Sequence, residues 1–417
     1  MGYLALLRAN RNFRLLWIAQ VISEIGDWFY TVAIYSLLLE YTGSAKSIAL
    51  AFTLQVLPQF ICSPSAGVIN DRLSRRSVMI FADYARAVIV VCMLFVRGPE
   101  SVNFLYALLF LETIMWALFE PGRTATIPNI TEGEDVIRGN ALSSITWSFN
   151  FAVGSALGGV VAAFFGRQTV FALNAVSFVV SGLLIQRMRF VEPHLKGLPP
   201  FHPRDLFDFK PILEGFLYVK ANSRLAATML VKAGLGLIGT NWVILPILGR
   251  DAFPVKMPGL SGDQSATLGM SLLLGARGFG AICGPLIAGY IAKHKEERMR
   301  PAIVYGFLMA SAGYLLLSLT SSTWLAALSV ALAHAGTSIT WVFSTTLLQL
   351  NTEDKFRGRV FSVEFGFSVA MMAVMSTSAG ILIDQGVSPF GLAAITGAVM
   401  LIPAVAWLFA LRLWRAE

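Results

Sequence analysis

The sequence predicts an all-α polytopic membrane protein, with twelve transmembrane helices arranged in two six-helix halves. Of its 417 residues, 56% are hydrophobic and only 13% are charged. A soluble protein cannot cover that much apolar surface with so few charges. The apolar residues form twelve runs, each long enough to cross a bilayer, and an internal repeat relates the first six runs to the last six.

The predicted spans follow one another with polar breaks between them. A helix needs about 20 predominantly apolar residues to cross the hydrocarbon core. Runs of that kind lie near residues 13–39, 46–69, 77–97, 102–121, 140–165, 168–187, 225–248, 265–292, 301–320, 323–349, 359–384 and 389–411.

The positions of Lys and Arg predict the orientation. With the N-terminus in the cytoplasm, 24 of the 32 basic residues fall in cytoplasmic segments, five on the opposite side and three inside spans. Basic residues accumulate on the cytoplasmic side of membrane proteins. Both termini are therefore expected to be cytoplasmic. The net charge of +8 comes from short clusters between spans, which argues against a nucleic-acid-binding face.

The longest polar break, residues 188–224, divides the chain into halves of residues 1–187 and 225–417. We expect this cytoplasmic linker to contain a short amphipathic helix over Leu206–Tyr218. The proline-rich stretch before it cannot be one continuous helix.

The two halves are related by short matching segments. Ile61–Ile69 in the second span matches Ile282–Ile291 in the eighth, with one insertion. Parallel repeats of this kind place a substrate site between the halves, near the membrane midplane. Pairs of small residues, which let helices approach closely, occur in four related spans. They are Ser63/Gly67, Gly154/Gly158, Gly280/Gly284 and Ser376/Gly380.

The loop after the second span contains a glycine, an acid and a run of bases: Gly67, Asp71, Arg72, Arg75 and Arg76. It resembles the signature between helices two and three of the major facilitator superfamily, although Ser74 stands where that family often has glycine. Together with the twelve spans and the repeat, the resemblance covers essentially the whole chain. It implies a secondary transporter with the major facilitator fold.

Further segments resemble one branch of that superfamily. Arg123–Asn129, Gly139–Leu142 and Gly358–Ser362 are similar to the macrolide-efflux and siderophore-exporter branch, to which bacterial lysophospholipid transporters are related. The opening Asn12–Trp17 and the pair Gly26-Asp27 fit the efflux branch better.

Two positions depart from the antiporters of that superfamily. Ser155 replaces the usual proline of the helix-five signature, between Gly154 and Gly158. Helix four has Glu112 where many drug/proton antiporters have an arginine.

The loop signature predicts a cytoplasmic gate. A carboxylate such as Asp71 is stabilised at a helix N-terminus, and the resemblance implies helix eleven as its partner. The arginines can pair with acids at cytoplasmic helix ends, such as Glu120, or can serve only as positive-inside anchors. Gly67 is the glycine of the same signature.

Two carboxylates near the middle of the first span are the main functional candidates. Glu24 and Asp27 share a helical face with Gln20 and Thr31. Such a face must look at protein or water, because a charge facing lipid costs several kcal/mol. Burial disfavours the charged form of a carboxyl group, which lets it bind and release protons near neutral pH. We expect proton coupling at both residues, with Asp27 preferred because it follows the glycine as in the resembling branch. A fixed hydrogen bond or ion pair is the alternative.

Other charges inside the spans complete this prediction. Glu112, on one face with Trp116, is the third proton-coupling candidate, since the resemblance implies that helices one and four line the cavity. Arg277 and Lys232 can neutralise a first-half carboxylate across that cavity. His334 can relay a proton or simply pack.

Asp83 and Arg86 in span three lie three residues apart, so we expect them to satisfy each other as a structural pair.

The remaining candidates would contact substrate. Trp28, Tyr30, Trp116 and Trp242 suit a large apolar compound, although aromatic residues at helical spacing usually pack in the core. Asn241 follows several glycines, which predicts a flexible, cavity-facing stretch in span seven. The predicted substrate-contacting set adds Gln20, Arg277 and His334 to these residues.

The sequence favours a proton-coupled exporter of amphipathic small molecules, of drug, macrolide or siderophore type. It is expected to work by alternating access, as a monomer in the bacterial cytoplasmic membrane. The first alternative is a lysophospholipid transporter of the same fold, in which proton coupling can be absent. A membrane sensor without transport activity is another class that the sequence leaves open.

An enzyme is not expected, because the spans show neither paired catalytic aspartates nor a nucleotide-binding loop. No cofactor and no metal site is expected either. The three cysteines lie inside apolar runs, without zinc-ligand spacing.

Overall fold

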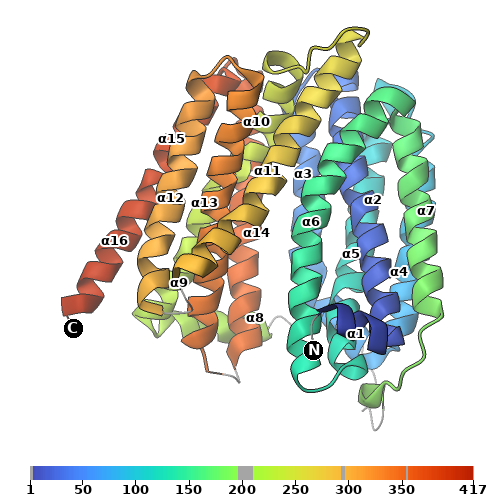
Figure 1. The fold of residues 1–417 in the computed structure, drawn as a ribbon, viewed down its shortest axis with the longest axis vertical. Helices are drawn as coiled ribbons and strands as arrows, with labels where there is room; N and C mark the ends of the chain where they lie inside the picture. The colour runs from blue at the N-terminus through green and yellow to red at the C-terminus, as the bar shows by residue number, and fades with distance from the viewer. Residues whose placement is uncertain (1–2, 196–209, 293–295, 354–355, 417) are drawn as a thin grey trace. The chain divides into compact units, whose positions relative to one another are not determined.

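The computed structural model describes residues 3–195, 210–292, 296–353 and 356–416. Within these ranges the chain is helical and has no β-strand. It forms two compact units, one of residues 1–41 and 54–208 and one of residues 42–53 and 209–417. Figure 1 shows that the long helices of each unit lie side by side.

The helices up to residue 195 form the first unit, except for residues 42–53, which belong to the second unit. They are α1 (Tyr3–Ala9), α2 (Arg11–Thr42), α3 (Ala45–Arg72), α4 (Arg75–Met93), α5 (Val102–Ile130), α6 (Glu134–Phe165) and α7 (Arg167–Gln186), with short 3-10 turns at Pro99–Ser101 and Pro193–Leu195.

The remaining helices belong to the second unit. They are α8 (Lys210–Lys220), α9 (Ser223–Gly236), η4 (Leu237–Thr240), α10 (Asn241–Ile247), η5 (Leu248–Ala252), α11 (Gly262–Ala292), α12 (Glu296–Leu319), α13 (Thr323–Leu350), α14 (Arg357–Asp384), α15 (Pro389–Val399) and α16 (Leu401–Ala416).

Ten helical stretches of the described chain are long and apolar enough to cross a membrane. The run from α9 to η5 counts as one of them, and so does the pair α15 and α16. Helices α2 and α4 occupy the other two predicted spans, with 32 and 19 residues. The twelve predicted spans thus all coincide with helices, and the protein is an all-α, multi-pass membrane protein.

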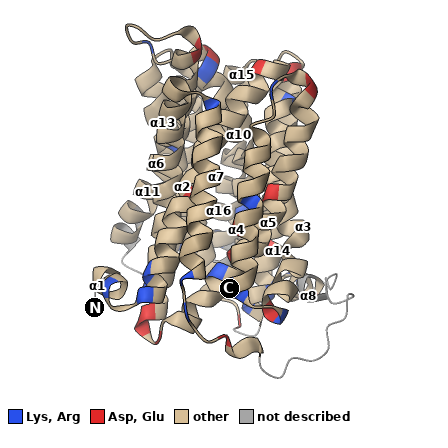
Figure 2. Cartoon of the chain, turned by 90° about the vertical axis from the view of Figure 1, so that its right-hand side faces the viewer, with Lys and Arg blue, Asp and Glu red and all other residues tan. Residues whose placement is uncertain are grey.

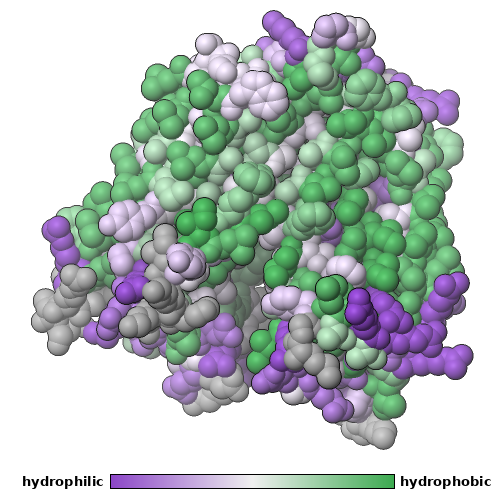
Figure 3. All heavy atoms as spheres, viewed as in Figure 1, coloured by the Kyte–Doolittle hydropathy of each residue, from purple (hydrophilic) through white to green (hydrophobic). Residues whose placement is uncertain are grey.

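The charges of α4 point inward, which is why α4 can be a membrane helix despite them. Asp83 and Arg86 are 0% and 1% exposed, whereas Phe81, Val88 and Val91 on the same helix are exposed. This is the reverse of a soluble helix, and it suits a hydrocarbon solvent. Figure 2 shows charged residues mainly at the helix ends with a few along their length, and Figure 3 shows hydrophobic side chains over much of the visible surface.

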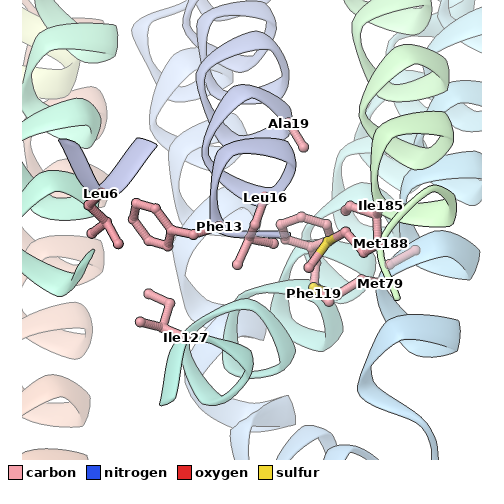
Figure 4. Packing of buried hydrophobic residues seen from close by; sticks show 10 residues of the cluster. Leu6, Phe13, Leu16, Ala19, Met79, Phe119, Ile127, Ile185 and Met188 are labelled. Atoms are coloured by element: carbon pink, nitrogen blue, oxygen red, sulfur yellow. The ribbon is translucent and has the colours of Figure 1, made fainter. Parts of the chain in front are cut away.

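One end of the first unit is closed by an apolar cluster that ties α1 to four long helices. Burial of such side chains is worth about 1.5–3 kcal/mol for each large residue relative to water. Figure 4 shows its members meeting from α1, α2, α4, α5 and the end of α7. They are Leu6, Phe13, Leu16, Ala19, Met79, Ala82, Phe119, Ile127, Ile185 and Met188.

Two of the predicted small-residue pairs bring helix backbones together. A Cβ at Gly158 of α6 would lie 2.5 Å from the Cα of Phe29 in α2, and one at Gly154 would lie 2.6 Å from the Cβ of Trp28. In the second unit, Gly280 and Gly284 of α11 abut the backbone of α13 in the same way. By contrast, a Cβ at Gly67 meets no described atom within 4 Å, so the pair Ser63/Gly67 does not show this close packing.

We expect Gly158→Leu to destabilise the protein. The new side chain would have to push α2 away from α6, and overpacking of this kind typically costs about 1–3 kcal/mol. Thermal unfolding in detergent should therefore occur at a lower temperature than in the wild type. Gly289→Leu is the matched control, because a Cβ there meets no described atom within 4 Å. Equal unfolding temperatures for both variants would contradict this packing.

The start of α3 belongs to the second unit because α14 caps it. The Asp384 carboxylate at the end of α14 accepts hydrogen bonds from the Ala45 backbone N–H at 2.7 Å and from the Ser44 hydroxyl at 2.5 Å. A carboxylate at a helix N-terminus satisfies its free N–H groups and the helix dipole. Gly380, one turn earlier, packs against Ala49.

The segment predicted as an amphipathic helix overlaps α8, and residues 206–209 of that segment lie outside the described ranges. Glu214 pairs with Arg359 at 2.8 Å, and Tyr218 stacks on Phe356 with ring centroids 4.1 Å apart. Leu217 on the other face is exposed. Helix α8 therefore packs its inner face on α14 and leaves apolar side chains outside.

Candidate functional site

A buried guanidinium group in the first unit lies between two carboxylates. Arg86 of α4 forms an ion pair with Asp83, and its Nη1 lies 3.7 Å from Oδ2 of Asp27 in α2. The predicted pair of Asp83 and Arg86 is confirmed. Arg86 is not restricted to this partner, because it also contacts Asp27 in the first predicted span. The local spacing of three residues on α4 makes the first contact, and the packing of α2 makes the second.

The surroundings of Arg86 hold it in place. Its guanidinium carbon lies 4.6 Å and 4.2 Å from the ring centroids of Phe119 in α5 and Phe178 in α7. Ser181 of α7 donates a 2.7 Å hydrogen bond to the second oxygen of Asp83. Cation–π contacts of this kind stabilise a cation that has been removed from water. The side chains of Arg86 and Asp83 are therefore held in fixed positions.

A third carboxyl group joins this cluster from α5. Glu112 accepts a 3.1 Å hydrogen bond from the Tyr30 hydroxyl, and its charge interacts with those of Arg86 and Asp27. Gln55 of α3 lies within 3.5 Å of the same hydroxyl and within 3.3 Å of the Tyr35 hydroxyl. The sequence prediction that places Asp27 and Glu112 near each other is consistent with this geometry.

The three carboxyl groups are not equally enclosed. The residues Asp83 and Glu112 are 0% and 5% exposed, whereas 20% of the Asp27 side chain is exposed. Oδ1 of Asp27 has no hydrogen-bond partner among the described residues. Asp27 is thus the most exposed carboxyl group of the cluster, and its buried Oδ1 has unused hydrogen-bonding capacity.

The charges of the cluster do not balance. Asp27, Asp83 and Glu112 all act on one guanidinium group, that of Arg86. With every carboxyl ionised, the cluster would hold two uncompensated negative charges. Uncompensated buried charge is strongly unfavourable. Protonation of a carboxyl group relieves this imbalance, so the arrangement is suited to binding and releasing protons.

Glu24, one turn before Asp27, belongs to a separate network of hydrogen bonds. It accepts from the Gln20 amide at 2.9 Å and from the Asn150 amide of α6 at 3.0 Å. Gln20 also accepts a 3.0 Å hydrogen bond from Arg123 of α5. Glu24 is therefore held by neutral donors, with Arg123 as the nearest compensating charge.

Arg123 connects this network to Glu120. It donates to Glu120 from Nε at 2.9 Å, and it also contacts the Ser143 hydroxyl of α6. The sequence suggested Glu120 as a partner for the arginines of the loop signature. In the structure Glu120 pairs with Arg123 instead, three residues along the same helix.

The other members of the loop signature lie at the end of α3 and the start of α4. Asp71 is exposed and pairs with Arg75 at 3.5 Å. Arg75 donates to the Ala125 carbonyl at 2.9 Å, and Arg76 to the Ile185 carbonyl at 3.3 Å. Arg72 is the half-buried last residue of α3. These contacts tie α4 to α5 and α7 within the first unit.

The predicted aromatic residues of the first unit have different surroundings. Trp28 packs against Trp147 and Phe151 of α6, with ring centroids 5.8 Å and 4.3 Å away. Trp116 is half-buried on α5, one turn after Glu112, and Tyr30 is 3% exposed. Trp28 is therefore a packing residue as well as a substrate-contact candidate.

Lys232 of the second unit pairs with Glu364 of α14, a carboxylate of the same unit, with Nζ 3.1 Å from Oε1. The sequence interpretation missed Glu364. The signal was present, because Glu364 is an acid inside an apolar run, and such residues pair with another charge or line a functional site.

The remaining candidates of the second unit lie on α10, α11 and α13. The Arg277 guanidinium carbon is 3.6 Å from the Trp242 ring centroid, and Trp242 stacks on Phe52 at 4.6 Å. His334 contacts the Tyr314 hydroxyl at 3.2 Å and is 5% exposed. Asn241 donates a 2.6 Å hydrogen bond to the Ile238 carbonyl, at the 3-10 break η4.

The glycines before Asn241 serve packing in this structure. A Cβ at Gly236 or Gly239 would lie 2.5–2.6 Å from Met371 or Met372 of α14. Asn241 and Trp242 are 2% and 8% exposed. The helix is interrupted here by η4, and the stretch that was predicted to be flexible and cavity-facing is buried.

Among the described residues, no group of three or more His, Cys, Asp or Glu side chains is placed to hold a metal ion.

Comparisons with known proteins agree with this architecture. A model of the transmembrane secretion effector family, MFS_3, matches residues 2–417. The macrolide efflux protein A of Streptococcus pyogenes is 23% identical over 84% of this chain and 84% of that protein. The putative bacilysin exporter BacE of Bacillus subtilis (strain 168) is 24% identical, also over 84% of each chain.

A solved structure of the peptide transporter POT in complex with sulfate has a similar fold. The TM-score is 0.74, with 13% identity, and the match covers 100% of this chain and 98% of that one. At this identity the likeness concerns the fold alone. The sequence prediction of a transporter rather than an enzyme is confirmed by the family match. Because the family model covers nearly the whole chain, the protein belongs to the transmembrane secretion effector family of the major facilitator superfamily.

Proposed function

We propose that the protein is a proton-coupled exporter of amphipathic small molecules, working by alternating access. It would act as a monomer in the bacterial cytoplasmic membrane, with both termini in the cytoplasm. Two relatives reported above are named as exporters, of macrolides and of bacilysin, and this supports export over uptake. Neither is named as a lipid transporter, so the exporter is favoured over the lysophospholipid alternative.

The observation that carries the proposal is the imbalance around Arg86. Three carboxyl groups act on one guanidinium group, and Asp27 is partly exposed and has a buried oxygen without a hydrogen-bond partner among the described residues. We assign proton exchange to Asp27, with Glu112 as the second acceptor. A proton on Asp27 would weaken its 3.7 Å contact with Arg86, while the pair of Arg86 and Asp83 remains.

In this mechanism the proton changes how strongly α2 is held to α4. Ionised Asp27 attracts the Arg86 guanidinium, whereas the neutral acid does not. A ligand shifts a conformational equilibrium only by its different affinity for the two states. If one state of the transporter binds a proton at Asp27 more tightly than the other, protonation favours that state. Loss of the proton then favours the state in which Asp27 is ionised.

We assign substrate contact separately in each unit. In the first unit the candidates are Gln20, Trp28, Tyr30 and Trp116, which lie on α2 and α5 near the carboxylates. Glu24 belongs with them, because its amide partners can be exchanged for polar groups of a substrate at modest cost. In the second unit the candidates are Asn241, Trp242, Arg277 and His334. Asp71 and its neighbouring arginines, Arg72, Arg75 and Arg76, with Gly67, remain the proposed cytoplasmic gate, without Glu120, which pairs with Arg123.

Export from proteoliposomes with an imposed pH gradient tests the function. Erythromycin, a macrolide, is a suitable probe because of the relative named above. We expect transport of erythromycin against its concentration gradient while the pH gradient lasts, and a loss of that uphill transport when a protonophore is added. Uphill transport that persists with the protonophore present would contradict proton coupling. Empty liposomes control for passive diffusion.

A further inference from the structure

The second unit contains an ion pair that the first-unit mechanism does not use. Lys232 of α9 and Glu364 of α14 lie 3.1 Å apart, and their side chains are only 3% and 5% exposed. A buried ion pair does not by itself add stability, because both charges lose their hydration. An intramembrane pair of this kind is more often part of a function than of the scaffold.

The ammonium group of Lys232 has a second partner. Its Nζ lies 3.6 Å from the centroid of the Trp341 ring on α13. Tryptophan is the most favourable aromatic residue for a cation, and the attraction is strongest where water is excluded. Lys232 can therefore keep its charge stabilised when Glu364 is neutral.

The carboxyl group of Glu364 has unused hydrogen-bonding capacity. Its Oε1 has no hydrogen bond of good geometry, although Lys232 lies at ion-pair distance. The Ser368 hydroxyl, one turn further along α14, is also buried without a hydrogen-bond partner among the described residues. A protonated Glu364 becomes a donor, and Ser368 offers an acceptor on the same face of the helix.

The charges around Glu364 are few. Helix α14 packs against α8, α9, η4, α10 and α15, and its last turns also pack against the start of α3, which carries Lys46. Of the described residues on these elements, η4, α10 and α15 have no ionisable side chain. Glu214 of α8 pairs with Arg359, and Arg224 lies exposed at the start of α9. Lys232 of α9 is therefore the charge that acts on Glu364, and His334 is the titratable residue of α13, the helix that carries Trp341.

We propose that Glu364 is a second proton-binding site, which exchanges its ion pair with Lys232 for a proton. The proton adds to the carboxylate, the ammonium stays charged over the Trp341 ring, and the net charge of the cluster changes from zero to +1. The significance of this site for transport rests on the proposed function. Proton binding at Glu364 does not depend on Asp27.

Infrared difference spectra of the full-length protein in bilayers, recorded between two pH values, test the proposal. A carboxyl group that takes up a proton gains a C=O stretching band, which shifts in heavy water. We expect such a band in the wild type, with a component from Glu364 that is lost in Glu364→Gln while the component from Asp27 remains. Glu297→Gln, which changes an exposed glutamate, should leave the band in place. A band that persists in Glu364→Gln at full size would overturn the assignment.

Glu364→Gln alone leaves Lys232 without its carboxylate, so this variant can fail to fold. The neutral double variant Lys232→Met with Glu364→Gln avoids the unpaired charge and should lack the same band. Trp341 fluorescence gives a second readout, since the change at Glu364 alters the charge near its ring. We expect a pH-dependent change in the wild type that is absent from the double variant and from Trp341→Phe. No pH-dependent change in the wild type would also overturn the proposal.

The same spectra from Asp27→Asn separate the two sites. We expect the Glu364 band to remain in that variant. If uphill erythromycin transport proves independent of the pH gradient while the Glu364 band is present, the proposed function fails and proton binding at Glu364 stands. If transport depends on the pH gradient and the Glu364 band is absent, the proposed function stands and proton binding at Glu364 fails.

Discussion

Asp27→Asn is expected to abolish transport driven by a pH gradient while leaving downhill transport of erythromycin. Asparagine keeps the shape of the side chain but cannot ionise, so it can neither attract Arg86 nor release a proton. In proteoliposomes, uphill transport should fall to the level of empty liposomes, and exchange between equal concentrations of labelled and unlabelled erythromycin should continue.

Two matched variants make this result specific. Asp263→Asn makes the same chemical change at an exposed residue and should behave as the wild type. Glu24→Gln should keep its response to the gradient, because the amide partners of Glu24 belong to a separate network, and should instead raise the KM for erythromycin. Gradient dependence that survives in Asp27→Asn would exclude Asp27 as the coupling residue.

Arg86→Met is expected to have the largest effect on stability. Methionine fills part of the space, but it leaves Asp83 buried without its positive partner. Breaking one side of a buried ion pair costs about 3–5 kcal/mol. The free energy of unfolding, measured by chemical denaturation in detergent, should fall by about that amount, and pH-gradient-driven transport should be lost with it.

A second substitution tests whether the unpaired buried charge causes the loss of stability. Arg86→Met with Asp83→Leu removes both charges of the fixed pair and should recover much of the lost stability. Arg138→Met breaks a surface pair with Glu134 and Asp135, and should change stability little. If the double variant is as unstable as Arg86→Met, the lost packing against Phe119 and Phe178 causes the destabilisation, and the unpaired charge does not.

The helices of this protein could be predicted from sequence because membrane spans have a strong local signal. Length and apolarity placed every predicted run on a helix, including α2 and α4, whose charges lower their hydropathy. The same reasoning found Glu24 and Asp27, since a charge in the middle of a span is rare. The glycines before Asn241 predicted a flexible, cavity-facing stretch, whereas in the structure they pack against α14.

The partners of these residues could not be predicted in the same way. Asp83 and Arg86 are three residues apart, so their pairing follows from helix geometry. The contact of Arg86 with Asp27 depends on how α2 is rotated against α4, and one sequence does not specify this rotation. The same holds for Lys232, whose ion pair with Glu364 depends on how α9 is rotated against α14.

Site residues that are polar but uncharged were the hardest to predict from the sequence. Asn150 and Ser143 of α6 join Glu24 and Arg123 in one network of hydrogen bonds. Uncharged polar residues such as these are common in membrane helices, so their type alone does not indicate a site. The serine in the glycine signature, Ser155, is 2% exposed and lies between the glycines that pack on α2. Its helix therefore keeps the close packing of the signature without the proline.

The most direct test of the account measures protons while substrate moves. Proteoliposomes with a pH-sensitive dye inside, no initial pH gradient and an imposed erythromycin gradient report proton movement that the substrate drives. Coupling is reciprocal, so a proton-driven exporter must also run in this direction. The account predicts proton movement opposite to erythromycin in the wild type and none in Asp27→Asn. Erythromycin flux in the wild type without any proton movement would contradict it.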